Sequence, residues 1–268
     1  MKNFFSGFTL TFLFIVTSAF TSPTDYKSAI RKPTETWQSA YERHFKTYQT
    51  VKGTRPPKNA QEAAVKIDKL DTRVATEWGK SIDLLSLFFS LRDVRFLQTK
   101  DDPNFLRRIS WLYPDDGCFA RAAMMVTKLR EDSIPDPSKV FIFGDLNVKT
   151  QNSPTGKVSW WYHVAPVVRT GEQVFVLDAA INAYQPLPLL DWVKTMTDDP
   201  MRVKLSICKA NSYVPSDSCY EPKESDASDA PEDQLIYLNE EWDRNVELGR
   251  NARDVLGDNP PWKGKQPL

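Results

Sequence analysis

Residues 158–178 read VSWWYHVAPVVRTGEQVFVLD, and this stretch predicts two antiparallel β-strands joined by a tight turn. Apolar and β-branched residues fill both halves, while Thr170 and Gly171 have the composition of a two-residue hairpin turn. A turn at these two positions places His163 directly opposite Asp178 on one face of the sheet, with Cβ atoms about 4.5–5.5 Å apart. We therefore expect a hydrogen bond between the imidazole of His163 and the carboxylate of Asp178.

The segments on either side of this hairpin predict an α+β fold. Apolar spacing close to the helical period predicts helices over residues 34–50, 59–98 (as one or two helices), 103–111, 117–129, 188–196 and within 235–256. Alternating residues predict strands over 139–150, 158–169, 172–178 and 202–208. A helix at 117–129 followed by antiparallel strands is the order found in papain-like and transglutaminase-like enzymes, although order alone says little about function.

The first 19 residues have the pattern of an export signal. Lys2 supplies a positive charge, residues 8–16 (FTLTFLFIV) are apolar, and small residues precede a cleavage point that we place after Ala19. The alternative is a single membrane anchor, but the apolar stretch 4–20 is short for a span and contains polar residues. We expect a secreted or periplasmic protein that has no stable membrane association once the signal has been removed.

Export changes the interpretation of the three cysteines. Disulfides persist in oxidising compartments, so we expect Cys208 and Cys219 to bond to each other and to hold the short loop between them. Cys118 is then unpaired. An unpaired cysteine of a secreted protein is either an inert core residue or a reactive nucleophile, and the sequence leaves both readings open.

Charge and composition exclude several classes of protein. The chain has 35 basic and 35 acidic residues, so it lacks the basic excess of a nucleic-acid-binding protein. It contains only two histidines, which excludes a zinc site built from several histidines, and the HExxH motif is absent. We therefore predict no nucleic-acid partner and no zinc site of these kinds. The triad chemistry described below requires no metal and no organic cofactor.

Cys118 lies where a thiolate is favoured. A cysteine in the first turn of a helix is close to unsatisfied N–H groups and to the positive end of the helix dipole, which both lower a thiol pKa. Gly117 permits a tight turn just before the helix, and Asp115 or Asp116 is available as its N-cap. With His163 as base and Asp178 as the group that orients it, these residues fit a Cys-His-Asp triad.

Four segments resemble the bacterial protein-glutaminase (protein-glutamine deamidase) family. They are 112–122 (LYPDDGCFARA), 139–146 (KVFIFGDL), 160–168 (WWYHVAPVV) and 176–178 (VLD), within a match of roughly 111–192. Ala179 follows the aspartate where the family pattern has proline. The resemblance implies a secreted enzyme with a papain/transglutaminase-like core, in which a nucleophile helix packs on an antiparallel sheet. It also implies that Cys118, His163 and Asp178 are catalytic.

The resemblance further implies the substrate, which is glutamine in proteins and peptides, hydrolysed to glutamate with release of ammonia. Trp161, which strand alternation places on the face of His163, is our candidate for a substrate contact, together with Gly117 and Asp116. The same triad also serves cysteine proteases and transglutaminases. A non-catalytic exported binding module remains the alternative from a different class.

The expected organisation has five parts. Residues 1–19 are the signal peptide, and 20–75 are a helical N-terminal extension. The resemblance implies a pro-region that covers the active site, for which this extension is the candidate as an intramolecular partner. Residues 76–220 form the catalytic domain, 221–234 (EPKESDASDAPEDQ) an acidic linker, and 235–268 a C-terminal helix and tail.

Overall fold

The computed structural model describes residues 36, 39, 42–43, 58–79 and 82–265. The predicted signal peptide, most of the predicted helix over 34–50, and most of the N-terminal extension lie outside the described residues. Among the described residues, no helix is both long and apolar enough to cross a membrane.

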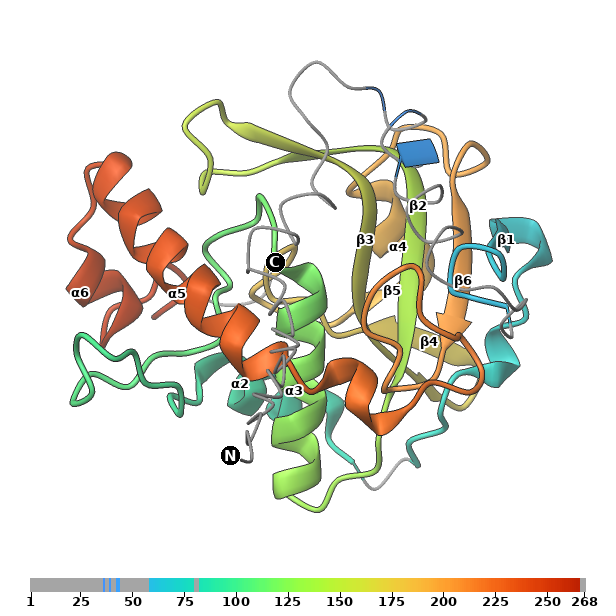
Figure 1. The fold of residues 1–268 in the computed structure, drawn as a ribbon, viewed down its shortest axis with the longest axis horizontal. Helices are drawn as coiled ribbons and strands as arrows, with labels where there is room; N and C mark the ends of the chain where they lie inside the picture. Colours follow the sequence, from blue (N-terminus) through green and yellow to red (C-terminus); the bar gives the residue numbers. More distant parts are fainter. Residues whose placement is uncertain (1–35, 37–38, 40–41, 44–57, 80–81, 266–268) are drawn as a thin grey trace, which may run out of the picture.

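One six-stranded antiparallel sheet forms the centre of the molecule (Figure 1). Its strands are arranged in the order β1-β6-β2-β3-β4-β5. Their bounds are β1 Val65–Lys66, β2 Ser138–Lys149, β3 Lys157–Thr170, β4 Gln173–Val176, β5 Leu187–Pro188 and β6 Lys204–Cys208. The four predicted strands are therefore present, with end points shifted by one or two residues at most ends.

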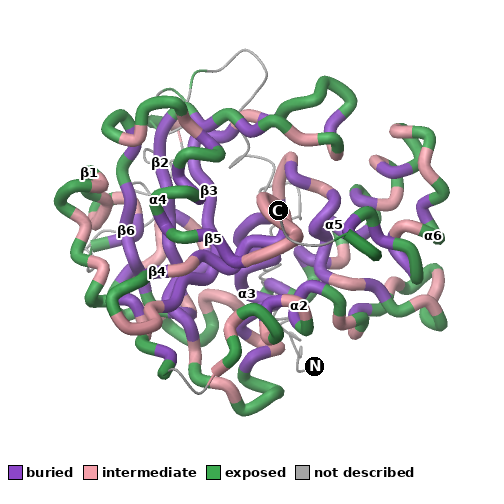
Figure 2. Tube along the Cα trace, turned by 180° about the vertical axis from the view of Figure 1, so that it is seen from behind, coloured by how far each residue is buried: buried purple, intermediate pink, exposed green. Residues whose placement is uncertain are grey.

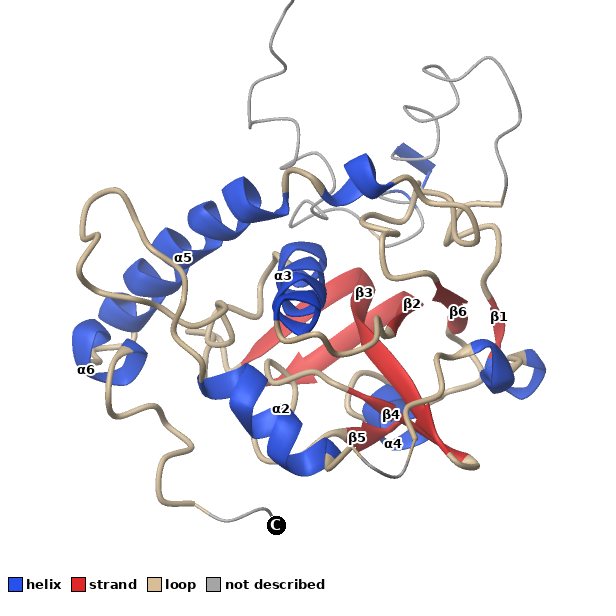
Figure 3. Cartoon of the chain, turned by 90° about the horizontal axis from the view of Figure 1, so that it is seen from below, coloured by secondary structure: helices blue, strands red, loops and turns tan. Residues whose placement is uncertain are grey.

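Helices cover both faces of this sheet (Figure 3). On one face, α3 (Cys118–Glu131) packs against alternate residues of the two long strands, including Phe141, Phe143 and Val164. On the other face, α4 (Leu189–Lys194) packs against the intervening residues, among them Val140 and Ile142. The sheet is thus buried from both sides, and its long strands are largely buried along the trace (Figure 2). This confirms the predicted α+β fold with its helix at Cys118.

Further helices are α2 (Leu84–Asp93), α5 (Ala230–Glu247) and α6 (Ala252–Leu256). Short 3₁₀ turns at Ile67–Lys69 and Thr72–Val74 precede α2, and another at Glu224–Ala227 precedes α5. The long helix α5 runs across the outer side of α3 (Figure 3). It begins at Ala230, inside the segment predicted as an acidic linker, and Asp233 and Gln234 are buried in it rather than solvated.

Two predicted helices are wrong. Helical spacing over 59–78 is misleading, because this stretch forms only a short strand and 3₁₀ turns and its backbone pairs with distant segments. Val65 pairs with Leu205, and the N–H of Trp78 donates to the carbonyl of Arg169. Residues 103–111 form no helix either, because the backbone of Arg107 pairs with that of Leu97. In both places, tertiary hydrogen bonds override local apolar spacing.

The hairpin turn also differs from the prediction. The strands close at Thr170 and Gln173, so Gly171 and Glu172 form the turn, and Gly171 has a φ of 62°. A positive φ is required at the first position of a tight hairpin turn, and glycine adopts it without strain. The register is therefore shifted by two residues, and His163 is not directly opposite Asp178.

Candidate active site

Cys118 is the first residue of α3 and is a free cysteine, 7% exposed. Gly117 precedes it with φ 78°, a left-handed conformation that turns the chain sharply into the helix. No side chain caps this helix, which corrects the prediction that Asp115 or Asp116 is its N-cap. Asp116 instead accepts the N–H of Gly117 at 2.7 Å. The first backbone N–H groups of an α-helix have no partner within the helix, and they carry the positive end of its dipole.

His163 and Asp178 meet despite the shifted register. A shift of two residues keeps both side chains on one face, so they become diagonal neighbours within side-chain reach. Nε2 of His163 lies 2.7 Å from Oδ2 of Asp178, and both side chains are almost fully buried. The same Oδ2 accepts the indole N–H of Trp192 at 2.9 Å, which fixes the carboxylate from α4.

The thiol completes this row of groups. Cys118 hydrogen-bonds to His163, and because Nε2 faces Asp178, Nδ1 is the ring nitrogen left for the thiol. Burial lowers the pKa of His163, but the charge and hydrogen bond of Asp178 and the contact with Cys118 outweigh it and raise the pKa to about 9. Burial pushes the pKa of Asp178 up, and the imidazole of His163 and the donors around it reverse this, so the pKa lies below its usual range.

The indole that packs on His163 is that of Trp160. The two rings are stacked with centroids 4.6 Å apart and an interplanar angle of 11°. Trp160 also donates its indole N–H to the carbonyl of Asp115 at 3.1 Å. Trp161, the residue favoured from strand alternation, is 2% exposed and packs against Phe143 and Tyr162. Its role as a substrate contact stays a prediction.

Asp116 and Gly117 lie against α5. Burial raises the pKa of Asp116 to about 6, against the opposing effects of the Gly117 N–H and a hydrogen bond with Tyr237. A Cβ added to Gly117 would lie 2.6 Å from ring atoms of Tyr237, so this side of the glycine is filled by protein. A substrate can reach Gly117 only from its other side, and the substrate roles predicted for Asp116 and Gly117 remain predictions.

Sequence reasoning missed two residues of this site. The sequence predicts Trp192 only as part of a helix, and strand alternation favours Trp161 over Trp160 as a substrate contact. The direction of an indole ring and the partner of its N–H depend on which segments meet in the fold, and no spacing in the sequence carries that information. The predicted disulfide between Cys208 and Cys219 is confirmed.

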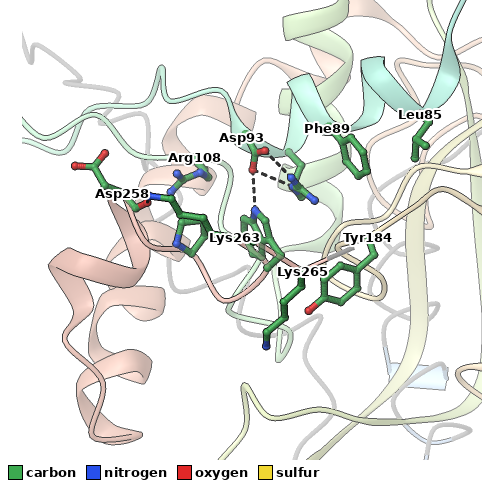
Figure 4. Close-up of a pocket in the computed structure, with 12 residues that line it drawn as sticks. Leu85, Phe89, Asp93, Arg108, Tyr184, Asp258, Lys263 and Lys265 are labelled. Atoms are coloured by element: carbon green, nitrogen blue, oxygen red, sulfur yellow. Dashed lines mark hydrogen bonds and ion pairs between the residues drawn. The ribbon is translucent and has the colours of Figure 1, made fainter. Parts of the chain in front are cut away.

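A separate cavity of about 730 Å³ lies between α2 and the C-terminal segment (Figure 4). Phe89, Tyr184 and Trp262 line it, and Asp93 holds both Arg92 and the indole of Trp262 at its wall. None of Cys118, His163 and Asp178 lines this cavity. Among the described residues, no group of three or more His, Cys, Asp or Glu side chains could hold a metal ion.

Comparison with known proteins found one family model that matches part of the chain. Residues 84–196 match the family model described as Glutaminase. This part of the chain is similar to the glutaminase family. The matched residues include Cys118, His163, Asp178 and Trp192, and the match confirms the resemblance seen in the sequence.

The chain is also similar to solved structures of protein-glutaminases. The chain is 20% identical to a crystal structure of pro-protein-glutaminase, covering 84% of this chain and 69% of that one, with a TM-score of 0.43. It is 22% identical to a protein-glutaminase crystal structure, covering 72% and 95%, with a TM-score of 0.42. It is 21% identical to an NMR structure of protein-glutaminase from Chryseobacterium proteolyticum, covering 69% and 91%, with a TM-score of 0.39. A search of curated proteins gave no match.

Proposed function

We propose that this protein is an exported protein-glutaminase, which converts glutamine side chains of proteins and peptides to glutamate and releases ammonia. The observation that carries the proposal is the hydrogen-bonded row Cys118–His163–Asp178 inside a domain matched as Glutaminase. No metal or organic cofactor takes part in the proposed reaction, because the thiol, imidazole and carboxylate supply every proton and electron pair that the reaction needs.

Acylation uses the thiolate–imidazolium pair. The sulfur of Cys118 attacks the δ-carbon of glutamine, and the carbonyl oxygen becomes an oxyanion. Backbone N–H groups at the start of α3, including that of Cys118, stabilise this oxyanion, and losing one such donor costs about 3 kcal/mol of barrier in comparable sites. His163 gives its proton to the departing nitrogen, the C–N bond breaks, ammonia leaves, and a thioester remains on Cys118.

Deacylation reverses the role of His163. The neutral imidazole takes a proton from water, and the hydroxide attacks the thioester carbon. The C–S bond breaks, the product is glutamate, and the sulfur leaves as a thiolate beside a protonated His163. Asp178, held by Trp192, keeps the imidazole in the orientation that both steps require.

Export and a pro-region are part of the proposal. The Cys208–Cys219 disulfide fits an oxidising compartment, and the apolar N-terminus has the pattern of a cleaved signal. One structural neighbour is a pro-protein-glutaminase, and the part of residues 20–75 that precedes the sheet strand β1 is the candidate for a similar segment here. We expect activity to rise when limited proteolysis removes this segment.

The test compares three readouts on one sample. Purified protein, before and after limited proteolysis, is incubated with casein and with a blocked glutamine peptide; ammonia, substrate mass and chain length are then measured. The proposal predicts ammonia release and exchange of NH₂ for OH on an intact peptide. Cleaved peptide would instead indicate a protease, and cross-linking to a lysine amine a transglutaminase. Absence of all three reactions would leave a binding module as the better description.

A further inference from the structure

Three residues of α5 lie on one face of the helix and contact the loop that leads to Cys118. Tyr237, Glu241 and Arg244 are spaced by four and three residues, which stacks them on one side of a helix. Each contacts a different part of residues 112–117, the last residues before the nucleophile. The whole of α5 lies outside the residues matched by the family model.

Glu241 holds the beginning of this loop. Its Oε1 accepts the N–H of Leu112 at 2.8 Å, and its Oε2 accepts Nη2 of Arg107 at 2.8 Å. Both charged side chains are 3% exposed. A buried pair of this kind is costly to break, because removing one partner leaves the other charge buried and unpaired. The backbone of Leu112 is therefore firmly attached to α5.

Arg244 holds the end of the loop. Its Nη1 donates to the carboxylate of Asp115 and to the carbonyl of Asn152, the latter at 2.9 Å. Its guanidinium also lies over the ring of Tyr113, 5.2 Å from the centroid. A second carboxylate, Glu247, pairs with Nε at 3.0 Å from the solvent side.

Asp115 connects Arg244 of α5 to the imidazole of His163. Its carboxylate binds Arg244, while its carbonyl accepts the indole N–H of Trp160, whose ring stacks on His163. Along the chain, Asp115 is three residues before Cys118. Asp115 thus connects α5 to both reacting groups. It is joined to Cys118 through the backbone, and to the imidazole of His163 through the indole of Trp160.

We infer that Arg244 is a positioning residue. It acts through Asp115 to fix the position of the Cys118 thiol relative to the His163 imidazole, which stacks on Trp160. The inference rests on the proposed function and extends it to a helix outside the matched domain. Misplacing reacting groups by about 1 Å costs a large factor in rate without requiring any change in affinity. Loss of the Arg244–Asp115 pair therefore lowers kcat rather than raising KM.

The test uses Asp115→Asn and Arg244→Gln with Glu247→Gln as the matched control. Asp115→Asn and Glu247→Gln each remove one carboxylate from the same arginine, but only Asp115 belongs to the loop. We expect Asp115→Asn and Arg244→Gln to lower kcat about 10- to 100-fold with little change in KM. The double variant should be hardly worse than either single one, because the two residues act as a unit. Glu247→Gln should match the wild type.

A second readout separates positioning from stability and does not need turnover. The rate of alkylation of Cys118 by iodoacetamide is measured against pH for all variants and for Arg244→Lys. This last substitution keeps the positive charge but removes the planar guanidinium that bonds to several partners at once. A positioning role predicts an altered alkylation profile in Asp115→Asn and Arg244→Gln, and partial recovery in Arg244→Lys. Unchanged profiles and kcat with only a lower Tm, or an equal effect of Glu247→Gln, would overturn the inference. If the wild type releases no ammonia, the proposed function fails, and the alkylation profiles still decide the positioning role.

Discussion

His163 has a buried acid on one ring nitrogen and a thiol on the other, and this arrangement predicts the pH dependence of the reaction. The pKa of His163 is raised to about 9, so the imidazolium needed to protonate the departing nitrogen persists at neutral pH and is lost as pH rises through 9. We expect the alkaline limb of kcat/KM to fall near pH 9. A limb close to 6.5, the ordinary histidine range, would contradict the geometry.

Asp178→Asn tests the cause of that shift. Without the carboxylate, His163 loses the charge that raises its pKa, so the alkaline limb moves to lower pH. Comparable substitutions in triads lower kcat by about 10⁴-fold, because the imidazole then favours the wrong tautomer. The measurement is the pH profile of ammonia release. A variant with near wild-type kcat and an unmoved limb would show that Asp178 does not orient His163.

Trp192→Phe tests the donor behind Asp178. The substitution keeps an aromatic ring in the core and removes the indole N–H that binds Oδ2. We expect kcat to fall about tenfold, as for the loss of a hydrogen bond that orients a catalytic group, while the folded state persists. Trp78→Phe is a suitable comparison, because its indole is equally buried but bonds to the carbonyl of Pro135, on another element. Equal losses in both variants would point to general destabilisation.

At this scale, the sequence could predict which side chains meet but not how they are held. The contact of His163 with Asp178 survived an error of two residues in the register, since a shift by an even number keeps the face. The positions of Trp160 and Trp192 could not be predicted, because they depend on where the loop before α3 and the helix α4 pack against β3.

Among the elements, the segment between Cys208 and Cys219 depends most on a covalent bond. The two cysteines are separated by 11 positions, and closing a loop of that length stabilises a protein by about 3 kcal/mol in the chain-entropy model. We expect Cys208→Ser/Cys219→Ser, made on a Cys118→Ala background, to lose about this much free energy of unfolding in urea. The background variant prevents exchange with the lone thiol. A loss below about 0.5 kcal/mol would mean that the loop is held by its hydrogen bonds alone.

Elements with local causes were predictable, and elements with distant causes were not. The helix from Cys118 and the long strands carry their own periodicity over 12 or more residues. Residues 59–78 show helical spacing as well, but they form no α-helix, and backbone bonds tie Val65 to Leu205 and Trp78 to Arg169. The acidic stretch before Leu235 looked like a linker, because nothing in its composition indicates that Asp233 meets the hydroxyl of Tyr213.

For the molecule as a whole, Lys139 makes stability depend on pH. Its side chain is fully buried beneath α3, its Nζ donates to the carbonyl of Ser212 at 3.0 Å, and burial lowers its pKa to about 7. The unfolded chain holds this proton up to about pH 10.5, so between pH 7 and 10.5 the unfolded state binds more protons. The contribution of Lys139 to the free energy of unfolding therefore rises with pH between pH 7 and 10.5.

Lys139→Met isolates this contribution. We expect the free energy of unfolding of the wild type, relative to Lys139→Met, to increase by about 2 kcal/mol between pH 7 and 9 in urea titrations. His163 has the opposite effect on the free energy of unfolding, because its stabilising contribution is lost as pH rises through about 9. This contribution is present in both proteins and cancels in the difference. A difference that stays constant with pH would show that Lys139 keeps its proton in the folded state.

The central claim is that ammonia release passes through the sulfur of Cys118. The direct measurement is activity against the fraction of Cys118 alkylated by iodoacetamide, quantified by peptide mass with the Cys208–Cys219 disulfide intact. Activity should fall in proportion to alkylation and reach zero at full modification, and a glutamine substrate should slow the labelling. A protein fully alkylated at Cys118 that still releases ammonia from glutamine would contradict the account.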